Sequence, residues 1–466
     1  MALHFKKLAF AVAAGLILSA GSVSSQTLGS ALTAAYNNSG LLEQNRALLR
    51  AADEDVAQAM SALRPIVNWS ASMERRLSST SVGAADAART SQTVTSMGLV
   101  AELTLFDGGA NKYSVEAAKE KVLAVRQSLI SVEQDVLLNA IQAYMDVRSE
   151  TETVALRRNN LRVIQEELRA AQDRFDVGEV TKTDVALAEA RYAASNAQLA
   201  AAVGSLEQAR ARYRQATGVT AGVLSTPPQT PKLPATVAQA QSIALRNHPA
   251  LKEQQHNIKS AEFSVAATKA STGPTLKLRG TLGISDVYDT DTVSRSATVG
   301  LNASGPVYAG GRIPSIVRKA TSQLSAQKSG LHVTRRAVEQ TTATAYALLE
   351  MTRASRQATQ EQIRAAQVAF DGVREEATLG ARTTLDVLNA EQELLNAKAD
   401  LIGALADEQI AAYRVLAQMG QLTVDHLNLP VQKYDPVQYY NLVKDAPGTQ
   451  SEQGKALDRV LKAINE

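Results

Sequence analysis

The stretch that decides the fold occurs twice, as LFDGGANKYSVEAAKEK at residues 105–121 and as VYAGGRIPSIVRKATSQ at residues 307–323. The offset of 202 positions between the two copies also aligns Gly178 with Gly380 further along the chain. One ungapped offset that holds over about 110 residues indicates an internal repeat. The chain is therefore predicted to consist of two copies of one structural unit.

In each copy, two segments with alternating apolar and polar residues precede the Gly-Gly pair. In the first of them, Val67 and Trp69 lie on one face, while Asn68 lies on the other. Alternation over about ten residues is typical of strands that contact lipid on one face and a polar lumen on the other. The pattern predicts β-hairpins at residues 66–106 and 275–308. The strand-to-helix breaks are Gly108, Gly109, Gly310 and Gly311.

Four strands cannot span a bilayer alone, because every backbone polar group in lipid needs a partner and the sheet must close. Two chains would supply eight strands, around a lumen filled by side chains. Three chains would supply twelve strands, which leave room for an opening. The alternating pattern does not choose between these two assemblies.

A very long helix is predicted behind each Gly-Gly pair, because no glycine or proline occurs between Gly109 and Gly178. About 65 helical residues would extend for about 100 Å. Apolar residues at Ala118, Val122 and Val125 recur at spacings of four and three, which is a heptad-type seam that packs against other helices. The fold class is therefore mixed α+β and mostly helical. Helices are expected at residues 112–176, 182–217, 313–378 and 384–419.

The composition excludes several classes of protein. The 466 residues include no cysteine, so disulfides, cysteine-bound zinc and thiol catalysis are absent. A net charge of +3 is too small for a strongly basic nucleic-acid binder of this length. The segment GGANK lacks the spacing of a phosphate-binding loop, and the five histidines form no HExxH motif. We predict no enzymatic activity, no cofactor and no metal site.

The amino terminus predicts export. Lys6 and Lys7 precede an apolar run at residues 8–18, which is typical of a cleaved signal peptide, with an uncleaved anchor as the alternative. The predicted segments are a signal peptide at 1–25, a first repeat at 26–224, a proline-rich linker at 225–236, a second repeat at 237–420 and a partly irregular periplasmic tail at 421–466.

Two long motifs carry a family resemblance, RFDVGEVTKTDVALAEARY at 174–192 and ATLGARTTLDVLNAEQELLNAKADL at 377–401. With the Gly-Gly breaks and the duplication, they resemble the TolC family of outer-membrane channel-tunnels. The resemblance implies a homotrimer with one shared twelve-stranded barrel in outer-membrane lipid and a helical tunnel through the periplasm.

That resemblance also implies a function and partners. The protein would be a passive exit duct of a tripartite efflux or type I secretion system, gated at its periplasmic tip. It would bind a periplasmic adaptor and an inner-membrane transporter of the ABC or proton-driven type. The resemblance does not choose between secreted proteins and small molecules as the cargo. The alternative is a periplasmic coiled-coil adaptor or structural protein without a pore.

Family positions assign candidate site residues at the two turns. Arg382 matches a locking arginine, with Thr183 and Asp184 as its partners. Asp386 matches a constriction carboxylate, and Asn389 replaces a second one. The alternative for both aspartates is capping of the helices that begin there. The adaptor-contact positions are Val177, Gly178, Glu179, Leu379, Gly380 and Ala381. The alternative for Gly178 and Gly380 is that they serve only to reverse the chain.

Overall fold

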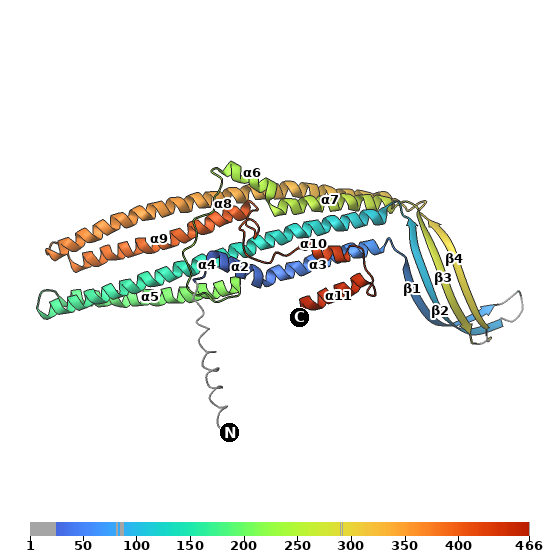
Figure 1. The fold of residues 1–466 in the computed structure, drawn as a ribbon, viewed down its shortest axis with the longest axis horizontal. Helices are drawn as coiled ribbons and strands as arrows, with labels where there is room; N and C mark the ends of the chain where they lie inside the picture. Colours follow the sequence, from blue (N-terminus) through green and yellow to red (C-terminus); the bar gives the residue numbers. More distant parts are fainter. Residues whose placement is uncertain (1–24, 81–82, 84–87, 289, 291, 466) are drawn as a thin grey trace, which may run out of the picture. The chain divides into compact units, whose positions relative to one another are not determined.

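The computed structural model describes residues 25–80, 83, 88–288, 290 and 292–465, and shows long helices joined to one β-sheet (Figure 1). The predicted signal peptide, apart from Ser25, lies outside these residues. Within the described chain, no helix combines the length and the hydrophobicity needed to cross a membrane.

The sheet has four antiparallel strands in the order β1-β2-β3-β4. One hairpin comes from each sequence repeat, and β2 pairs with β3 to join them. The last strand ends four residues before the predicted 308, because Pro306 has no backbone N–H to donate to a neighbouring strand. The strands are β1 (Ile66–Thr80), β2 (Ala88–Phe106), β3 (Thr275–Val287) and β4 (Thr292–Ser304).

Each sequence repeat contributes one long helix followed by a second helix that begins after a turn. The first pair is α4 (Ala110–Asp176) and α5 (Lys182–Thr217), and the second pair is α8 (Arg312–Thr378) and α9 (Thr384–Gln418). The remaining helices are α2 (Leu28–Asn38), α3 (Gly40–Ser61), α6 (Val237–Asn247), α7 (Pro249–Ala270), α10 (Pro436–Val443) and α11 (Glu452–Asn465). The carboxyl-terminal segment thus contains two short helices as well as irregular chain.

The Gly-Gly pairs lie between the strands and the long helices, and their backbone is left-handed. Gly108 and Gly109 have φ values of 66° and 88°, a region that side chains with a Cβ rarely adopt. Asp107 then starts α4, since its carboxylate accepts hydrogen bonds of 2.8 Å from the backbone N–H groups of Gly109 and Asn111. The second pair, at residues 310–311, has the same left-handed backbone.

Backbone contacts divide the chain into two compact units that cut across the sequence repeats. The first unit contains the described residues up to Leu42, Glu133–Ala244 and Gln340–Gln432. The second contains the sheet and consists of Glu43–Val132, Leu245–Glu339 and Lys433–Glu466. Both long helices contribute residues to both units, so neither repeat forms a unit by itself.

The first unit contains a buried tyrosine that holds the inter-repeat linker. Tyr144 is fully buried, and its hydroxyl lies 2.7 Å from the carbonyl oxygen of Ser225 and 3.1 Å from that of Gln26. The equivalent Tyr346 donates to the carbonyl oxygen of Pro234 at 3.0 Å. Each repeat therefore uses a tyrosine on its long helix to fix one end of the linker.

In the second unit, the heptad seam of α4 is buried against α3 and the carboxyl-terminal segment. Val122 forms a cluster with Leu49 and Val56 of α3, both of which are fully buried. Tyr434 and Tyr440 from the carboxyl-terminal segment pack against this cluster. The seam thus stabilises the unit by removing apolar side chains from water.

Candidate functional site

The two turns between long and short helices have the same backbone structure. After α4, the N–H of Gly178 donates to the carbonyl of Phe175 and that of Glu179 donates to the carbonyl of Arg174, both at 2.9 Å. This is the Schellman arrangement, which needs a left-handed residue, and Gly178 has a φ of 82°. The helix-reversing role of the glycine is therefore built into this turn.

The turn after α8 repeats this arrangement. The N–H of Gly380 donates to Ala377 at 3.1 Å, and that of Ala381 donates to Glu376 at 2.9 Å. Gly380 has a φ of 76°. The apolar residue before each glycine is exposed, at 72% for Val177 and 79% for Leu379.

A capping box starts each helix that follows a turn. The backbone N–H of Thr181 donates to the Asp184 carboxylate at 2.9 Å, and the Thr181 hydroxyl accepts from the Asp184 N–H at 3.3 Å. Thr383 and Asp386 make the same pair of contacts. The threonines are the N-cap residues, and the aspartates occupy the third helical position. These bonds, chiefly the one from the threonine backbone, lower the pKa of both aspartates.

Within one chain, Arg382 pairs with a residue of its own turn. Its Nε donates to the Glu376 carboxylate at 2.8 Å, and both side chains are about half exposed. Among the described residues, no hydrogen bond or ion pair joins Arg382 to Thr183 or Asp184. Within a single chain, the predicted lock residues are therefore on two different turns, with no hydrogen bond or ion pair between them among the described residues.

A different arginine links the two shorter helices. Arg191 of α5 donates through Nη2 to the amide oxygen of Asn389 on α9 at 2.6 Å. Asn389 is the exposed residue that its family position assigns to the constriction, whereas no sequence pattern singles out Arg191. The hydrogen bond between Arg191 and Asn389 forms because α5 lies near α9, and it cannot be inferred from local sequence because the two residues are 198 positions apart.

Glu391 is a second residue, after Arg191, that no sequence pattern singles out. It lies at a cavity of 230 Å³ between α4, α8 and α9. Glu391 lines this cavity together with Arg374 and Lys398. Burial, followed by the nearby charge of Glu167, raises the pKa of Glu391 to about 7, while Arg374 opposes the shift. This carboxyl therefore changes its charge near neutral pH.

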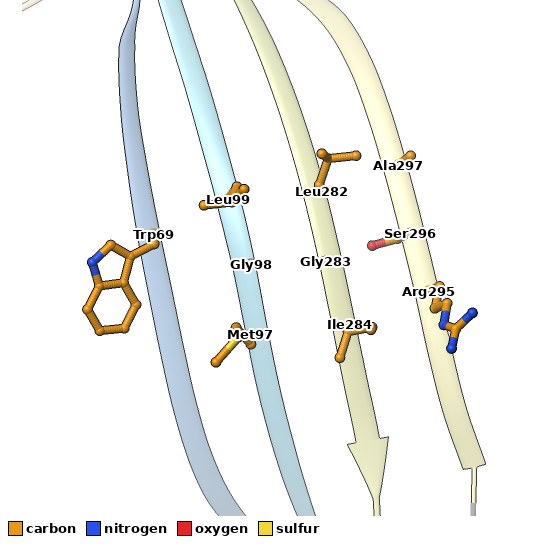
Figure 2. Close-up of a pocket in the computed structure, with 10 residues that line it drawn as sticks. All are labelled: Trp69, Met97, Gly98, Leu99, Leu282, Gly283, Ile284, Arg295, Ser296 and Ala297. Carbon is orange, nitrogen blue, oxygen red and sulfur yellow. The ribbon is translucent and has the colours of Figure 1, made fainter. Parts of the chain in front are cut away.

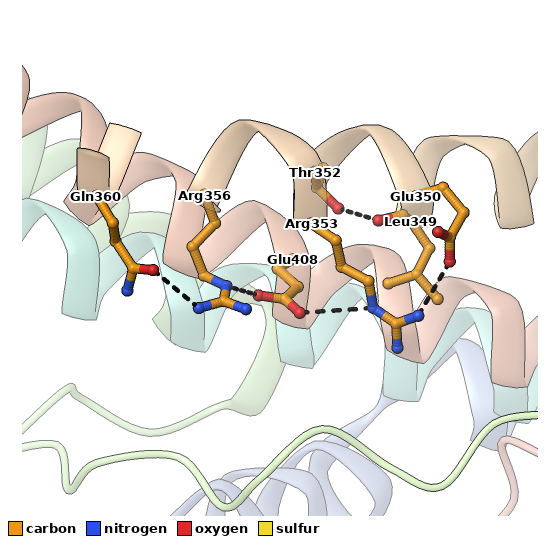
Figure 3. A network of polar contacts seen from close by, with 7 residues as sticks. All are labelled: Leu349, Glu350, Thr352, Arg353, Arg356, Gln360 and Glu408. Carbon is orange, nitrogen blue, oxygen red and sulfur yellow. Dashed lines mark hydrogen bonds and ion pairs between the residues drawn. The ribbon is translucent and has the colours of Figure 1, made fainter. Parts of the chain in front are cut away.

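Further along the same pair of helices, one carboxylate bridges two arginines (Figure 3). Glu408 of α9 is 13% exposed and lies 2.6 Å from Nε of Arg356 and 3.6 Å from Nε of Arg353 on α8. Arg353 also contacts Glu350 at 3.0 Å. This cluster holds α9 on α8 by ionic contacts.

The sheet presents two chemically different faces. Trp69, Leu99, Leu282 and Ala297 follow one another across the four strands on one face. They border an apolar groove of 670 Å³ (Figure 2), and Trp69 is 74% exposed. The other face is polar, with Lys277 paired to Glu102 at 2.7 Å. A surface of this kind fits lipid on one side and water on the other.

The described residues contain no group of three or more metal-ligating side chains that could hold a metal ion together.

A sequence profile of outer membrane efflux proteins matches residues 31–219 and 240–421. The chain belongs to the outer membrane efflux protein family. The two matched segments of this efflux family contain both pairs of long helices and all four strands.

Individual efflux proteins are similar over most of the chain. The outer membrane efflux protein BepC of Brucella suis is 37% identical over 437 residues, which cover 92% of this chain and 93% of BepC. The outer membrane protein TolC of Escherichia coli is 26% identical and covers 81% of this chain and 78% of TolC. The Campylobacter jejuni CmeC outer membrane channel shares the fold, with a TM-score of 0.74 at 18% identity over 91% of each chain.

Proposed function

We propose that three copies of this chain form an outer-membrane channel-tunnel, the passive exit duct of a tripartite efflux or type I secretion system. The observation that carries this proposal is the sheet, whose order leaves β1 and β4 at open edges while its apolar face is exposed. An open edge cannot lie in lipid, so other copies must pair with it. Twelve strands enclose an opening, whereas the lumen of eight strands is filled by side chains.

The two turns would form the periplasmic tip and its gate. Val177 and Leu379 occupy equivalent positions and expose apolar surface, which suits docking of an adaptor. Arg382 would lock the tip by reaching Thr183 and Asp184 of a neighbouring copy in place of Glu376. Three copies of Asp386 would form an anionic constriction that favours cations.

The test is the conductance of the purified protein in planar bilayers. Arg382→Ser combined with Asp184→Ala is expected to raise single-channel conductance several-fold, because the tip loses its lock. Thr181→Ala is the matched control, since it removes the hydroxyl contact of the same capping box but keeps the Asp184 charge. Unchanged conductance in the double variant would refute the lock, and the absence of any channel from the unmodified protein would refute the proposed function.

A further inference from the structure

The apolar face of the sheet carries arginines at one end. Because side chains alternate along a strand, Arg75 lies on the same face as Trp69, and Arg295 lies on the same face as Ala297. The register places Trp69 and Ala297 in one row across the sheet. Both guanidinium groups therefore project on the face that would meet lipid.

The two arginines lie at equal distances from the strand ends that join the helices. Arg75 is nine residues after Ile66, the first residue of β1, and Arg295 is nine residues before Ser304, the last residue of β4. Nine steps of about 3.4 Å, tilted by about 45°, rise by about 22 Å, close to the height of a transmembrane apolar band. Both arginines therefore fall at the far boundary of that band.

This boundary differs in charge from the opposite one. The residues of the apolar face near the helices are uncharged, as shown by Val67, Leu103, Leu278 and Leu301. Among the described residues at the hairpin end, the same face carries three arginines, Arg75, Arg89 and Arg295, and one acid, Asp286. The described part of this face is therefore positive at the hairpin end, which suits an anionic partner at one membrane surface only.

Arg295 is the better defined of the two groups. Among the described residues it forms no hydrogen bond or ion pair, whereas Nε of Arg75 donates to the Ser91 hydroxyl at 3.2 Å. Arg295 also borders the apolar groove, next to Ile284 and across the sheet from Met97 (Figure 2). A cation at the edge of an apolar groove fits a ligand with a phosphate head and hydrocarbon chains.

We propose that Arg75 and Arg295 bind the phosphate groups of lipid A in the outer leaflet, with an acyl chain in the groove between Trp69 and Ile284. This inference rests on the proposed function, because the channel orientation puts the hairpin ends at the outer surface. Guanidinium groups bind phosphate through paired charge-assisted hydrogen bonds. Lipid A suits two separated arginines, since it carries two phosphates and several acyl chains.

The experiment measures binding of purified lipid A to the intact protein in detergent by native mass spectrometry. Arg295→Gln and Arg75→Gln are each expected to weaken binding about tenfold, since each removes a charged hydrogen-bond donor. Arg279→Gln is the matched control, because this exposed arginine of β3 lies on the polar face. Lipid A stripped of its phosphates should bind the unmodified protein as weakly as intact lipid A binds a variant that carries both Arg75→Gln and Arg295→Gln.

Two results would overturn the inference. One is lipid A binding that is unchanged in both variants, and the other is equal, arginine-dependent binding of phosphatidylglycerol, which would assign the site to anionic lipids in general. Conductance measured on the same preparations distinguishes failure of the lipid A site from failure of the proposed function. Normal channels with arginine-independent lipid binding would refute only the lipid A site, whereas loss of all channel activity from the unmodified protein would refute the proposed function.

Discussion

The helical pair α4–α5 and the helical pair α8–α9 end in the same turn but differ in chemistry at one pair of equivalent positions. Both turns combine a left-handed glycine with a threonine-aspartate capping box. Away from the turn, α8 and α9 are joined by the ion pair between Arg356 and Glu408. The equivalent positions of the first pair are Val154 and Leu206, which are both buried.

This difference shows which positions of a duplicated unit require the same residue type in both copies and which do not. A helix reversal needs one residue with a left-handed backbone and a side chain that satisfies free N–H groups, and few residues can do either. A contact between two helices needs only complementary neighbours, so it can be apolar in one copy and ionic in the other. The equivalent residues Glu189 and Glu391 also differ between the copies, since Glu189 is exposed and Glu391 lines a cavity.

The largest effect is expected from truncating Leu206, a buried leucine of the first pair. Leu206→Ala should lower the free energy of unfolding by about 2–5 kcal/mol, because it leaves a cavity in a buried site. Arg356→Val with Glu408→Leu, which copies the first pair into the second, should be neutral or stabilising by about 1–4 kcal/mol. Denaturant unfolding followed by circular dichroism measures both changes.

Val203→Ala, at a position of α5 that is 40% exposed, is the control for Leu206→Ala and should cost less than about 1 kcal/mol. Equal losses from Leu206→Ala and from the double swap would contradict the distinction between an apolar and an ionic pair.

A smaller effect is expected from pH. The pKa of Glu391 is raised from 4.5 to about 7 in the folded chain, so its protonated form stabilises the fold. That contribution is fully present below about pH 4.5 and is lost as pH rises through about 7, with an upper limit of about 3 kcal/mol. Glu391→Gln should reduce the slope of unfolding free energy against pH between pH 4.5 and 8, and the remaining slope includes the contribution of Asp53, whose pKa burial raises to about 6.

Glu189→Gln supplies the comparison for the pH experiment, because this exposed carboxylate is at the equivalent position of the first repeat. Its substitution should leave the slope in place. A slope that is unchanged in Glu391→Gln would assign the pH dependence to other groups.

The smallest effects are expected at the turns. Gly178→Ala and Gly380→Ala should each cost about 1–2 kcal/mol, because a Cβ opposes the left-handed backbone. No atom lies within 4 Å of the position that a Cβ would take at either glycine, so steric contact with neighbours adds nothing. Thermal unfolding should show equal losses, whereas Gly204→Ala inside α5 should stabilise by up to about 1 kcal/mol. Clearly unequal losses at the two turns would refute their equivalence.

The sequence indicated the elements better than it indicated the site. Proline, the Gly-Gly pairs and the two isolated glycines are local signals, and the helices and strands of the structure begin and end beside them. The aspartates at positions 184 and 386 are also recognisable as capping candidates, although the N-cap residues themselves are Thr181 and Thr383. Arg191 and Glu391 gave no local signal, because their roles depend on partners from other helices.

The mostly helical fold, the four strands, the two glycine turns and the membership of a channel family can all be predicted from the amino-acid sequence. They can be predicted because backbone conformation responds to nearby residues and to the period of apolar side chains. Three further features follow only from the packed chain: Arg191 binds Asn389, Glu391 lines a cavity while Glu189 does not, and β2 pairs with β3. Those outcomes depend on side chains far apart in the chain, whose burial and charge arise only when the helices and strands pack.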